Sequence, residues 1–221
     1  MRKYRFIRSN AGDMGIGAMI VFIAMVLVAG IAASVLVQTA NRLENQAMTT
    51  GQQTTTEVST GLSVENICAQ KGTYNYSGTV ITNELLNATI AVAPRSGSKD
   101  IDLSKVTIEM SDASNKIVLN YTASLFKALD PKGIFDTAAF NGQAISFGVI
   151  KLVDADGSCL AASPVINRGD HVLLTISPGN SFGGWLARTT IWGLVIPEEG
   201  APGVFSFRTP TLLTDSVYEL S

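Results

Sequence analysis

The sequence predicts an α+β protein, in which a long N-terminal hydrophobic α-helix is followed by an antiparallel, immunoglobulin-like β-sandwich. Met14 to Val37 carries no charged residue, and the uncharged stretch continues to Asn41. From Leu62 onward, short runs rich in Val, Ile, Thr and aromatic residues alternate with turn residues, which is typical of strands. We therefore expect a leader at residues 1–12, a helix at 13–61 and an outer domain at 62–221.

The apolar run decides where this chain can reside. A helix rises about 1.5 Å per residue, so Met14–Val37 would span roughly 36 Å, enough to cross a bilayer core. Fifteen of its side chains are large and apolar. At about 2 kcal/mol each, leaving them in water would cost roughly 30 kcal/mol, more than the ~5–15 kcal/mol net stability of a typical domain. The segment must lie in lipid or be surrounded by protein.

The helix is expected to continue beyond the apolar run. No proline interrupts the sequence, and residues at three- or four-residue spacing mark one helical face: Leu43, Ala47, Thr50, Thr54 and Val58. A helix from Met14 to Thr60 would be roughly 70 Å long. Gly51 is a candidate bend and Gly61 a candidate stop. The alternative is a solvated linker rich in Thr and Gln.

A basic leader precedes the apolar run. Its four basic residues, with no acid beside them, are Arg2, Lys3, Arg5 and Arg8. Positive charge in front of an apolar helix keeps that end in the cytoplasm. An ordinary secretory signal has its small-residue cleavage site after the apolar core, whereas Ala11-Gly12 comes before it. A cut after Gly12 would keep the helix on the mature chain and change the formal net charge from −2 to −6. A cleavage site in front of the apolar helix is typical of a class III, prepilin-type signal.

The segment GDMGIGAMIVFIAMVLVAGIAASVLVQTA resembles the N-terminal helix of archaeal flagellins (archaellins), the type IV pilin-like subunits of the archaellum filament. The resemblance is specific from about Gly12 to Gly61 and concerns only the layout beyond that. It implies cleavage between Gly12 and Asp13, although Asn10-Ala11 replaces the basic residue usual beside that glycine. Gly17 stands at the fifth mature position, where bacterial type IV pilins normally carry Glu, and this favours an archaellin.

The resemblance implies a structural protein that polymerises with itself into an extracellular filament for swimming motility. The precursor would sit in the cytoplasmic membrane and meet a prepilin-type peptidase, and a separate motor and assembly ATPase complex would supply energy. The alternatives are an archaeal adhesion pilin and a single-span cell-surface binding protein that keeps its leader. Small residues spaced four apart allow close helix packing, and the residues we expect in self-assembly are Gly15, Gly17, Phe22, Ala29, Gly30, Ala33 and Ser34.

Composition agrees with a filament subunit. Charged residues make up only 15% of the chain, against about 25% in a typical soluble domain. A low charge density suits a subunit that buries much of its surface against copies of itself, although the apolar helix also dilutes the charge. The chain lacks the basic balance of a nucleic-acid-binding protein.

Eight strands are expected in the outer domain. They are Leu62–Ala69, Leu85–Ala93, Lys105–Met110, Lys116–Tyr121, Ala144–Val153, His171–Ser177, Thr189–Ile196 and Val204–Phe207. Ala123–Leu129 is expected to form one or two helical turns. Short strands without long intervening helices are typical of a sandwich.

Two kinds of covalent modification are expected. Cys68 and Cys159 are an even pair in an exported chain, which favours a disulfide, the alternative being two unrelated buried thiols. N-glycosylation sequons begin at Asn75, Asn87 and Asn120. The resemblance implies N-linked glycan at such sites, while ordinary strand or turn chemistry is the alternative.

No enzyme is expected, because no Ser/His/Asp set, phosphate loop or Cys/His metal cluster is visible and His171 is the only histidine. Asp154-Ala-Asp156-Gly157 resembles the start of a calcium loop but lacks the later acidic ligand, so a tight turn is the alternative. The resemblance also implies a structural metal ion in some relatives, and no other cofactor is expected. Arg168–Asp170 spells an adhesion tripeptide that a turn explains equally well. Trp185 and Trp192 fit either the core or a subunit contact.

Overall fold

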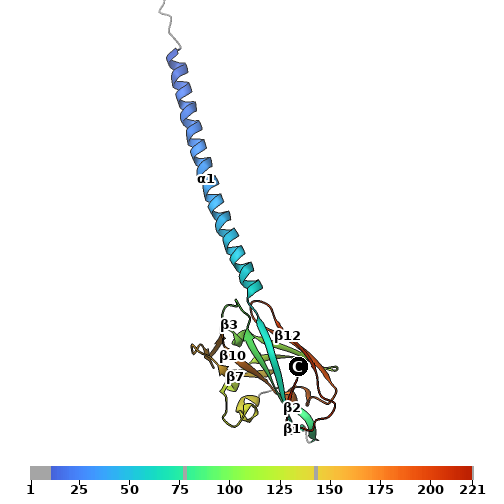
Figure 1. Ribbon diagram of the computed structural model, residues 1–221. Helices are drawn as coiled ribbons and strands as arrows, with labels where there is room; N and C mark the ends of the chain where they lie inside the picture. Colours follow the sequence, from blue (N-terminus) through green and yellow to red (C-terminus); the bar gives the residue numbers. More distant parts are fainter. Residues whose placement is uncertain (1–10, 77–78, 142–143, 221) are drawn as a thin grey trace, which may run out of the picture. The chain divides into compact units, whose positions relative to one another are not determined.

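The computed structural model describes residues 11–76, 79–141 and 144–220, without the side chains of residues 11–13 and 74–83 (Figure 1). The chain divides into two compact units, Met1–Gln53 and Thr54–Ser221. The expected leader up to Asn10 lies outside the described residues.

Helix α1 is continuous over Ala11–Ser59 and passes through Gly51. It ends two residues before Gly61, the expected stop. Gly61 instead forms a bridge with Ala201, and a Cβ at position 61 would lie 2.8 Å from the Ala201 carbonyl oxygen. Glycine is therefore required there for a close backbone approach within the outer domain rather than for ending the helix.

The outer domain is built mainly of strands. Their bounds are β1 Leu62–Tyr76, β2 Thr79–Pro94, β3 Ile101–Asp102, β4 Thr107–Ser111, β5 Lys116–Tyr121, β6 Lys127–Ala128, β7 Ser146–Val153, β8 Cys159–Leu160, β9 Ser163–Ile166, β10 His171–Ile176, β11 Thr190–Ile196, β12 Gly203–Arg208 and β13 Val217–Glu219. Short helices are η1 Leu103–Lys105, η2 Ala123–Leu125, η3 Ile134–Asp136, η4 Ala138–Phe140 and α2 Pro178–Phe182. The long strand path runs β12-β11-β4-β5-β7-β10-β2-β1-β13, and β3-β9-β8 form a small separate sheet.

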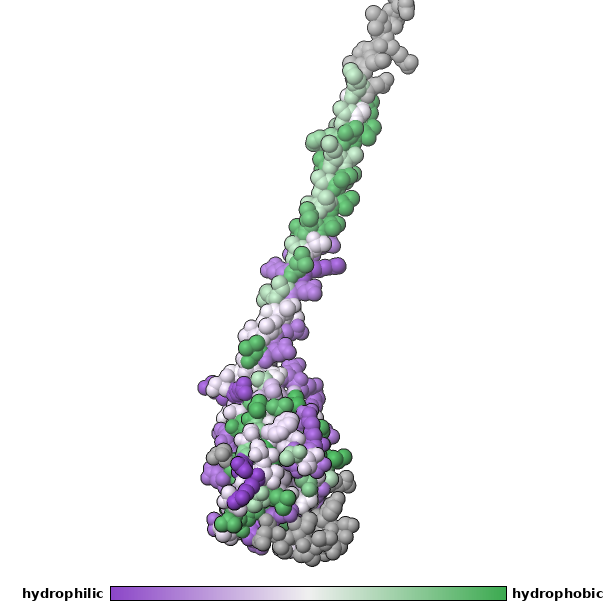
Figure 2. All heavy atoms as spheres, turned by 90° about the vertical axis from the view of Figure 1, so that its right-hand side faces the viewer, coloured by the Kyte–Doolittle hydropathy of each residue, from purple (hydrophilic) through white to green (hydrophobic). Residues whose placement is uncertain are grey.

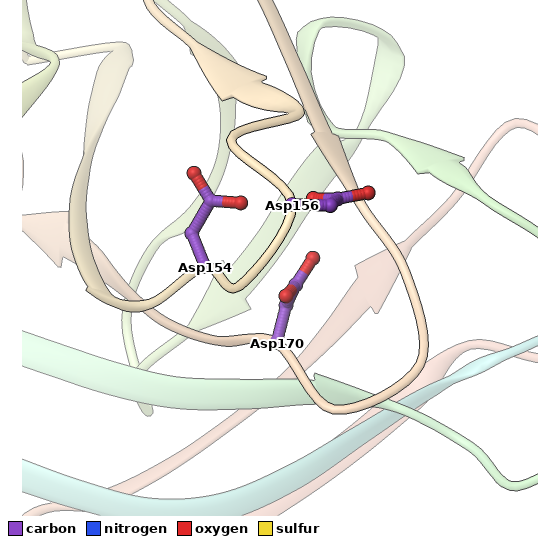
Figure 3. A group of neighbouring side chains, drawn as sticks. All are labelled: Asp154, Asp156 and Asp170. Atoms are coloured by element: carbon purple, nitrogen blue, oxygen red, sulfur yellow. The ribbon is translucent and has the colours of Figure 1, made fainter.

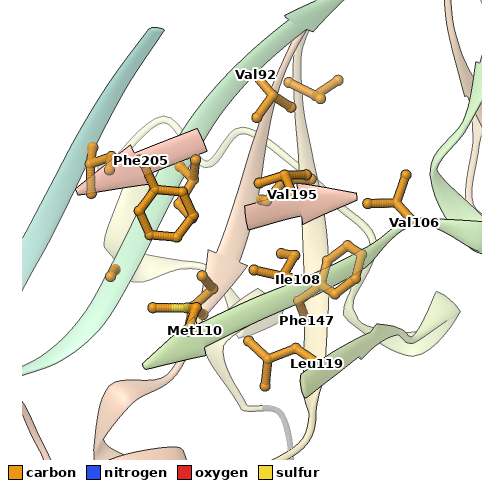
Figure 4. Close-up of a cluster of buried hydrophobic side chains, with 14 of the residues drawn as sticks. Val92, Val106, Ile108, Met110, Leu119, Phe147, Val195 and Phe205 are labelled. Atoms are coloured by element: carbon orange, nitrogen blue, oxygen red, sulfur yellow. The ribbon is translucent and has the colours of Figure 1, made fainter. Parts of the chain in front are cut away.

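The long path folds into two layers around one core. The layer β12-β11-β4-β5 joins the layer β7-β10-β2-β1-β13 where β5 pairs in parallel with the start of β7. Buried side chains from both layers meet between them, as Figure 4 shows for Val92 of β2, Phe147 of β7, Ile108 of β4 and Phe205 of β12. The prediction of a helix followed by a mostly antiparallel β-domain is confirmed.

The two layers differ in what covers their outer faces. On the layer that contains β7 and β10, a second apolar cluster joins Ile150 and Leu173 to Phe140 of η4, with Ile134 and Phe135 of η3 packed against it. The η3–η4 segment therefore covers that outer face. Residues of β10 are buried on both sides for this reason, from Val172 through Ile176.

The predicted strands are found with changed ends. The largest change concerns Leu62–Ala69 and Leu85–Ala93, which extend into one long hairpin paired from Leu62 opposite Pro94 to Tyr76 opposite Thr79. The extension is rich in polar residues and contains bulges, so it lacks the apolar alternation that marked the rest of each strand.

Of the one or two helical turns predicted in Ala123–Leu129, the structure contains one, at the start of the segment. The chain makes a single 3₁₀ turn over η2, closed by the Phe126 amide donating to the Ala123 carbonyl over 3.2 Å, and then forms β6. Pairing of β6 with β7 competes successfully with helix continuation. The short strands β3, β8, β9 and β13 and helix α2 were not expected, because segments of two to five residues have no readable period.

Gly148 provides a test of core packing. A Cβ at this position would lie 2.5 Å from the Leu125 carbonyl oxygen and 2.7 Å from Thr175 Oγ1. Gly148→Ala should therefore lower the free energy of unfolding by about 1–3 kcal/mol, measured by denaturant titration of the full chain in detergent. Leu152→Ala, on the exposed end of the same strand, serves as the control and should change it by less than about 1 kcal/mol. Equal effects of the two substitutions would contradict the packing described.

Candidate assembly helix and outer-domain sites

The apolar segment of α1 presents its side chains outward on all sides. Every residue from Met14 to Val37 is exposed, among them Phe22 at 67%. This helix is the one described segment that is long and apolar enough to cross a membrane. Figure 2 shows hydrophobic atoms covering its N-terminal part and polar atoms becoming frequent farther along. The segment needs surroundings that this chain does not itself provide.

Small residues open the backbone of this segment to a partner. Ala29 and Ala33 lie four residues apart, as do Gly30 and Ser34. A Cβ added at Gly15, Gly17 or Gly30 would meet nothing within 4 Å. These positions carry no packing role in the isolated chain, and they would let another helix approach closely.

Two threonine hydroxyl groups in the C-terminal half of α1 are bonded within the helix. Thr39 Oγ1 donates to the Leu36 carbonyl over 2.9 Å, and Thr49 Oγ1 donates to the Asn45 carbonyl over 2.8 Å. Such bonds let polar residues enter a packed environment without leaving a donor unpaired.

The predicted processing site lies in the first turn of α1. Gly12 and Asp13 are helical, and their side chains are outside the described set. Cleavage between them stays a prediction.

The structure corrects the predicted disulfide, since both cysteines are free thiols. Cys68 lies in β1, paired with Glu219 and Thr89, whereas Cys159 lies in β8 of the small sheet. The two strands belong to different sheets and no bond joins the cysteines, so the even cysteine count did not indicate a disulfide here. Burial raises the pKa of both thiols, that of Cys159 to about 11, which keeps them protonated and unreactive at neutral pH.

The three sequons have different environments. Asn120 is exposed on β5. Asn87 is half-buried, its amide donates to Gln70 Oε1 over 3.2 Å, and the sequon threonine Thr89 is 2% exposed. The backbone of Asn75 pairs with Val80, and its side chain is outside the described set. Of the two sequon asparagines whose side chains are described, Asn120 is therefore the more exposed.

Asp154 and Asp156 are joined by a third carboxylate, Asp170, which sequence reasoning assigned to a turn. Carboxylate oxygens of the three residues lie within 4.8 Å of one another (Figure 3). The side chain of Asp154 is fully buried, and Asp170 is 1% exposed. The burial of Asp170 also removes the adhesion-tripeptide interpretation of residues 168–170. Its position, thirteen or more residues after the turn, gave no spacing signal.

Hydrogen bonds fix the geometry of this cluster. Asp154 accepts from the Gly157 amide and from Lys151 Nζ, both over 2.9 Å. Asp170 accepts from the Asn167 amide over 2.9 Å. The Ser158 backbone amide, followed by the Ser158 and Asn167 side chains, holds the pKa of Asp156 at about 2. Lys151 balances one of three negative charges, so the oxygen donors fit a hard divalent cation.

The described residues offer no acid–base pair suited to catalysis. His171 Nδ1 lies 3.0 Å from Glu65 Oε2, and both side chains are half-exposed, as in a surface ion pair. A cavity of ≈ 340 Å³ is lined by Gly, Leu, Phe and uncharged polar residues, among them Asn87 and Thr137. Neither feature combines a nucleophile with a base.

Comparison with known proteins identifies the family of this chain. The sequence profile described as archaeal-type flagellin matches residues 12–207. The chain belongs to the archaeal-type flagellin family. It is 40% identical to Flagellin B2 of Methanocaldococcus jannaschii over 226 residues, covering 100% of both chains. It is 36% identical to Flagellin B3 of Thermococcus kodakarensis, covering 98% of this chain and 99% of the relative.

Solved structures agree with the fold. The crystal structure of archaeal flagellin FlaB1 from M. jannaschii matches with a TM-score of 0.61 at 29% identity, covering 73% of this chain and 96% of that one. The archaeal flagellum of Methanospirillum hungatei strain JF1 matches with a TM-score of 0.61 at 16% identity, covering 92% and 98%, and supports the fold. The chain is an archaeal flagellin, a structural subunit of the archaellum, which is an extracellular filament made by self-polymerisation.

The three-carboxylate cluster yields a testable prediction. Saturating Ca²⁺, at about 100 times its dissociation constant, should stabilise the metal-free full chain by about 2.7 kcal/mol and raise the unfolding temperature by about 5–10 °C. Asp156→Asn should remove most of this gain. Asp112→Asn, at a separate turn where Asp112 accepts from the Ser114 amide, is the matched control and should retain it. Unfolding temperatures that are identical with Ca²⁺ and with chelator would rule out the cation site.

Proposed function

We propose that this flagellin is made as a membrane precursor, with residues 1–12 in the cytoplasm and Met14–Val37 in the bilayer. A prepilin-type peptidase removes the leader between Gly12 and Asp13. The mature chain then polymerises through the same helix, which leaves the lipid and joins identical helices in the filament core. The observation that supports this most is the unbroken apolar surface of Met14–Val37, exposed on every side.

The exchange of lipid for helices is physically balanced. A helix satisfies its backbone hydrogen bonds internally, so it can move between two apolar environments without exposing polar groups. Association then depends on close packing, which small residues such as Ala29, Gly30 and Ala33 allow. A contact between copies that does not close into a ring produces an open helical polymer.

The filament would act as a passive propeller. Neither the sequence nor the described outer domain contains a nucleotide-binding loop or a catalytic constellation. Torque and the energy of assembly would come from a separate cytoplasmic ATPase and membrane motor. We assign no enzymatic activity to this chain because the flagellin family to which it belongs is one of structural filament subunits.

Two alternative functions predict different experimental outcomes. An adhesion pilin would leave swimming intact on deletion while abolishing attachment. A single-span surface protein would retain Met1 and its basic residues as a topological anchor. Family membership favours the flagellin over both.

Leader removal can be tested directly. Mass spectrometry of sheared surface filaments should find a mature N-terminus at Asp13. Gly12→Val should block cleavage, because the site requires a small residue, and should leave an unprocessed chain in the membrane fraction. Gly15→Ala, at a position where a Cβ meets nothing within 4 Å, is the control and should be processed normally. Filaments that contain an intact Met1 would refute the proposed pathway.

Helix packing can be tested separately from processing. Gly30→Leu keeps the segment apolar, so membrane insertion and cleavage should be unchanged. The added bulk should prevent close helix approach and reduce filament yield at least tenfold by electron microscopy. Val35→Leu adds only one methylene group at a position that is already large, and it should have little effect. Normal filaments from Gly30→Leu would show that this glycine does not line a helix contact.

A further inference from the structure

The layer β12-β11-β4-β5 carries apolar side chains on the face turned away from the core. Residues alternate along β11 and β12, so Ile191, Val195 and Phe205 are buried while Trp192 is 48% exposed and Val204 is 67% exposed. An antiparallel layer with one face on the core usually turns polar residues to water on the other. This layer departs from that pattern.

The exposed apolar residues are neighbours. The strand register aligns Val204, Leu194, Glu109 and Val118 in one row across four strands. Trp192 lies two residues from Leu194 on the same face, which is roughly 7 Å along the strand, and adjacent strands are about 4.8 Å apart. We define the β11 patch as Trp192, Leu194, Val204 and Val118.

The β11 patch carries no unbalanced charge in its row. Glu109 is the single acid there, and its Oε2 lies 2.7 Å from Lys116 Nζ. A neutral apolar surface can approach another copy of the same chain without like-charge repulsion. The two tryptophans lie in different environments: Trp185 is 1% exposed in the core, whereas Trp192 lies in the β11 patch.

The opposite layer shows what a covered face looks like. There the η3–η4 segment buries Phe140 against Ile150 and Leu173. In residues 54–76, 79–141 and 144–220 no segment packs over the β11 patch in the same way: three of its residues remain more than 40% exposed. Contiguous exposed apolar residues mark interaction sites.

We propose that the β11 patch is a contact surface between outer domains of neighbouring subunits in the filament. The proposal rests on the proposed function and names its second interface, beside the helix. The occupant is another copy, because the chain polymerises with itself and the patch is neutral. In an open helical polymer the patch meets a different surface of the neighbour. Tryptophan, which is enriched at the energetic centres of interfaces, would anchor the contact.

Tryptophan quenching tests this assignment. The variant Trp185→Phe leaves Trp192 as the single tryptophan. Loss of the Trp185 indole breaks no side-chain hydrogen bond within the described part of the chain, where its Nε1 has no partner. Acrylamide should quench Trp192 efficiently in detergent-dispersed subunits. In assembled filaments of the same variant the quenching constant should fall severalfold, because a neighbouring outer domain covers the ring.

Controls separate the possible outcomes. Trp192→Phe leaves the buried Trp185, which acrylamide should quench poorly in both states. If Trp185→Phe fails to fold, the quenching of Trp192 is obtained instead as the difference in quenching between wild type and Trp192→Phe. Equal quenching of Trp192 in filaments and dispersed subunits would overturn the proposal. Shielding of Trp192 already in dispersed subunits would also overturn it, since the cover would then be the chain's own, such as a glycan on Asn120. Absence of wild-type filaments would instead refute the proposed function.

Discussion

The apolar surface of Met14–Val37 is the constraint on which everything else in this protein depends. Its exposed side chains represent roughly 30 kcal/mol of unfavourable hydration. Two environments can remove that cost, a bilayer and a bundle of similar helices. A chain that meets the bilayer and then the helix bundle can use the same segment for insertion, processing and polymerisation. The free-energy cost of exposing that segment to water keeps the subunit from being released between the two.

The outer domain is independent of that constraint because it buries its own core. Its two strand layers enclose a continuous apolar cluster, and the η3–η4 segment covers the second face of one layer. Close backbone contacts fix where β1 begins, since a Cβ at Gly61 would collide with Ala201 and one at Gly200 would lie 2.2 Å from the Thr60 carbonyl oxygen. A domain that is complete in this way can face water permanently, which a filament surface requires.

Polar chemistry in the outer domain is structural in character. Asp154 and Asp170 each accept a backbone amide of their own turn, and the Asn167 side-chain amide links the two turns by donating to Asp156. His171 lies beside Glu65 at the surface. Burial raises the pKa of Tyr121 to about 12 and keeps its hydroxyl a donor to the Ala161 carbonyl, which links β5 to the turn after β8. These groups position loops, and none combines the accessibility and partners that catalysis needs.

The sequence by itself determined the helix, the family resemblance and most of the strands. The spacing of apolar residues and the absence of charge are local properties of the chain, and they do not depend on tertiary packing. Only the tertiary structure decided the rest. It left Cys68 and Cys159 as free thiols on different sheets, brought Asp170 to Asp154 and Asp156, and limited the helical turn at Ala123–Leu129 to Ala123–Leu125, with a short strand after it. It also placed Trp185 in the core and Trp192 on an uncovered face. Each of these outcomes depends on which strands pair and in what register, and contacts between residues distant in the chain set that register.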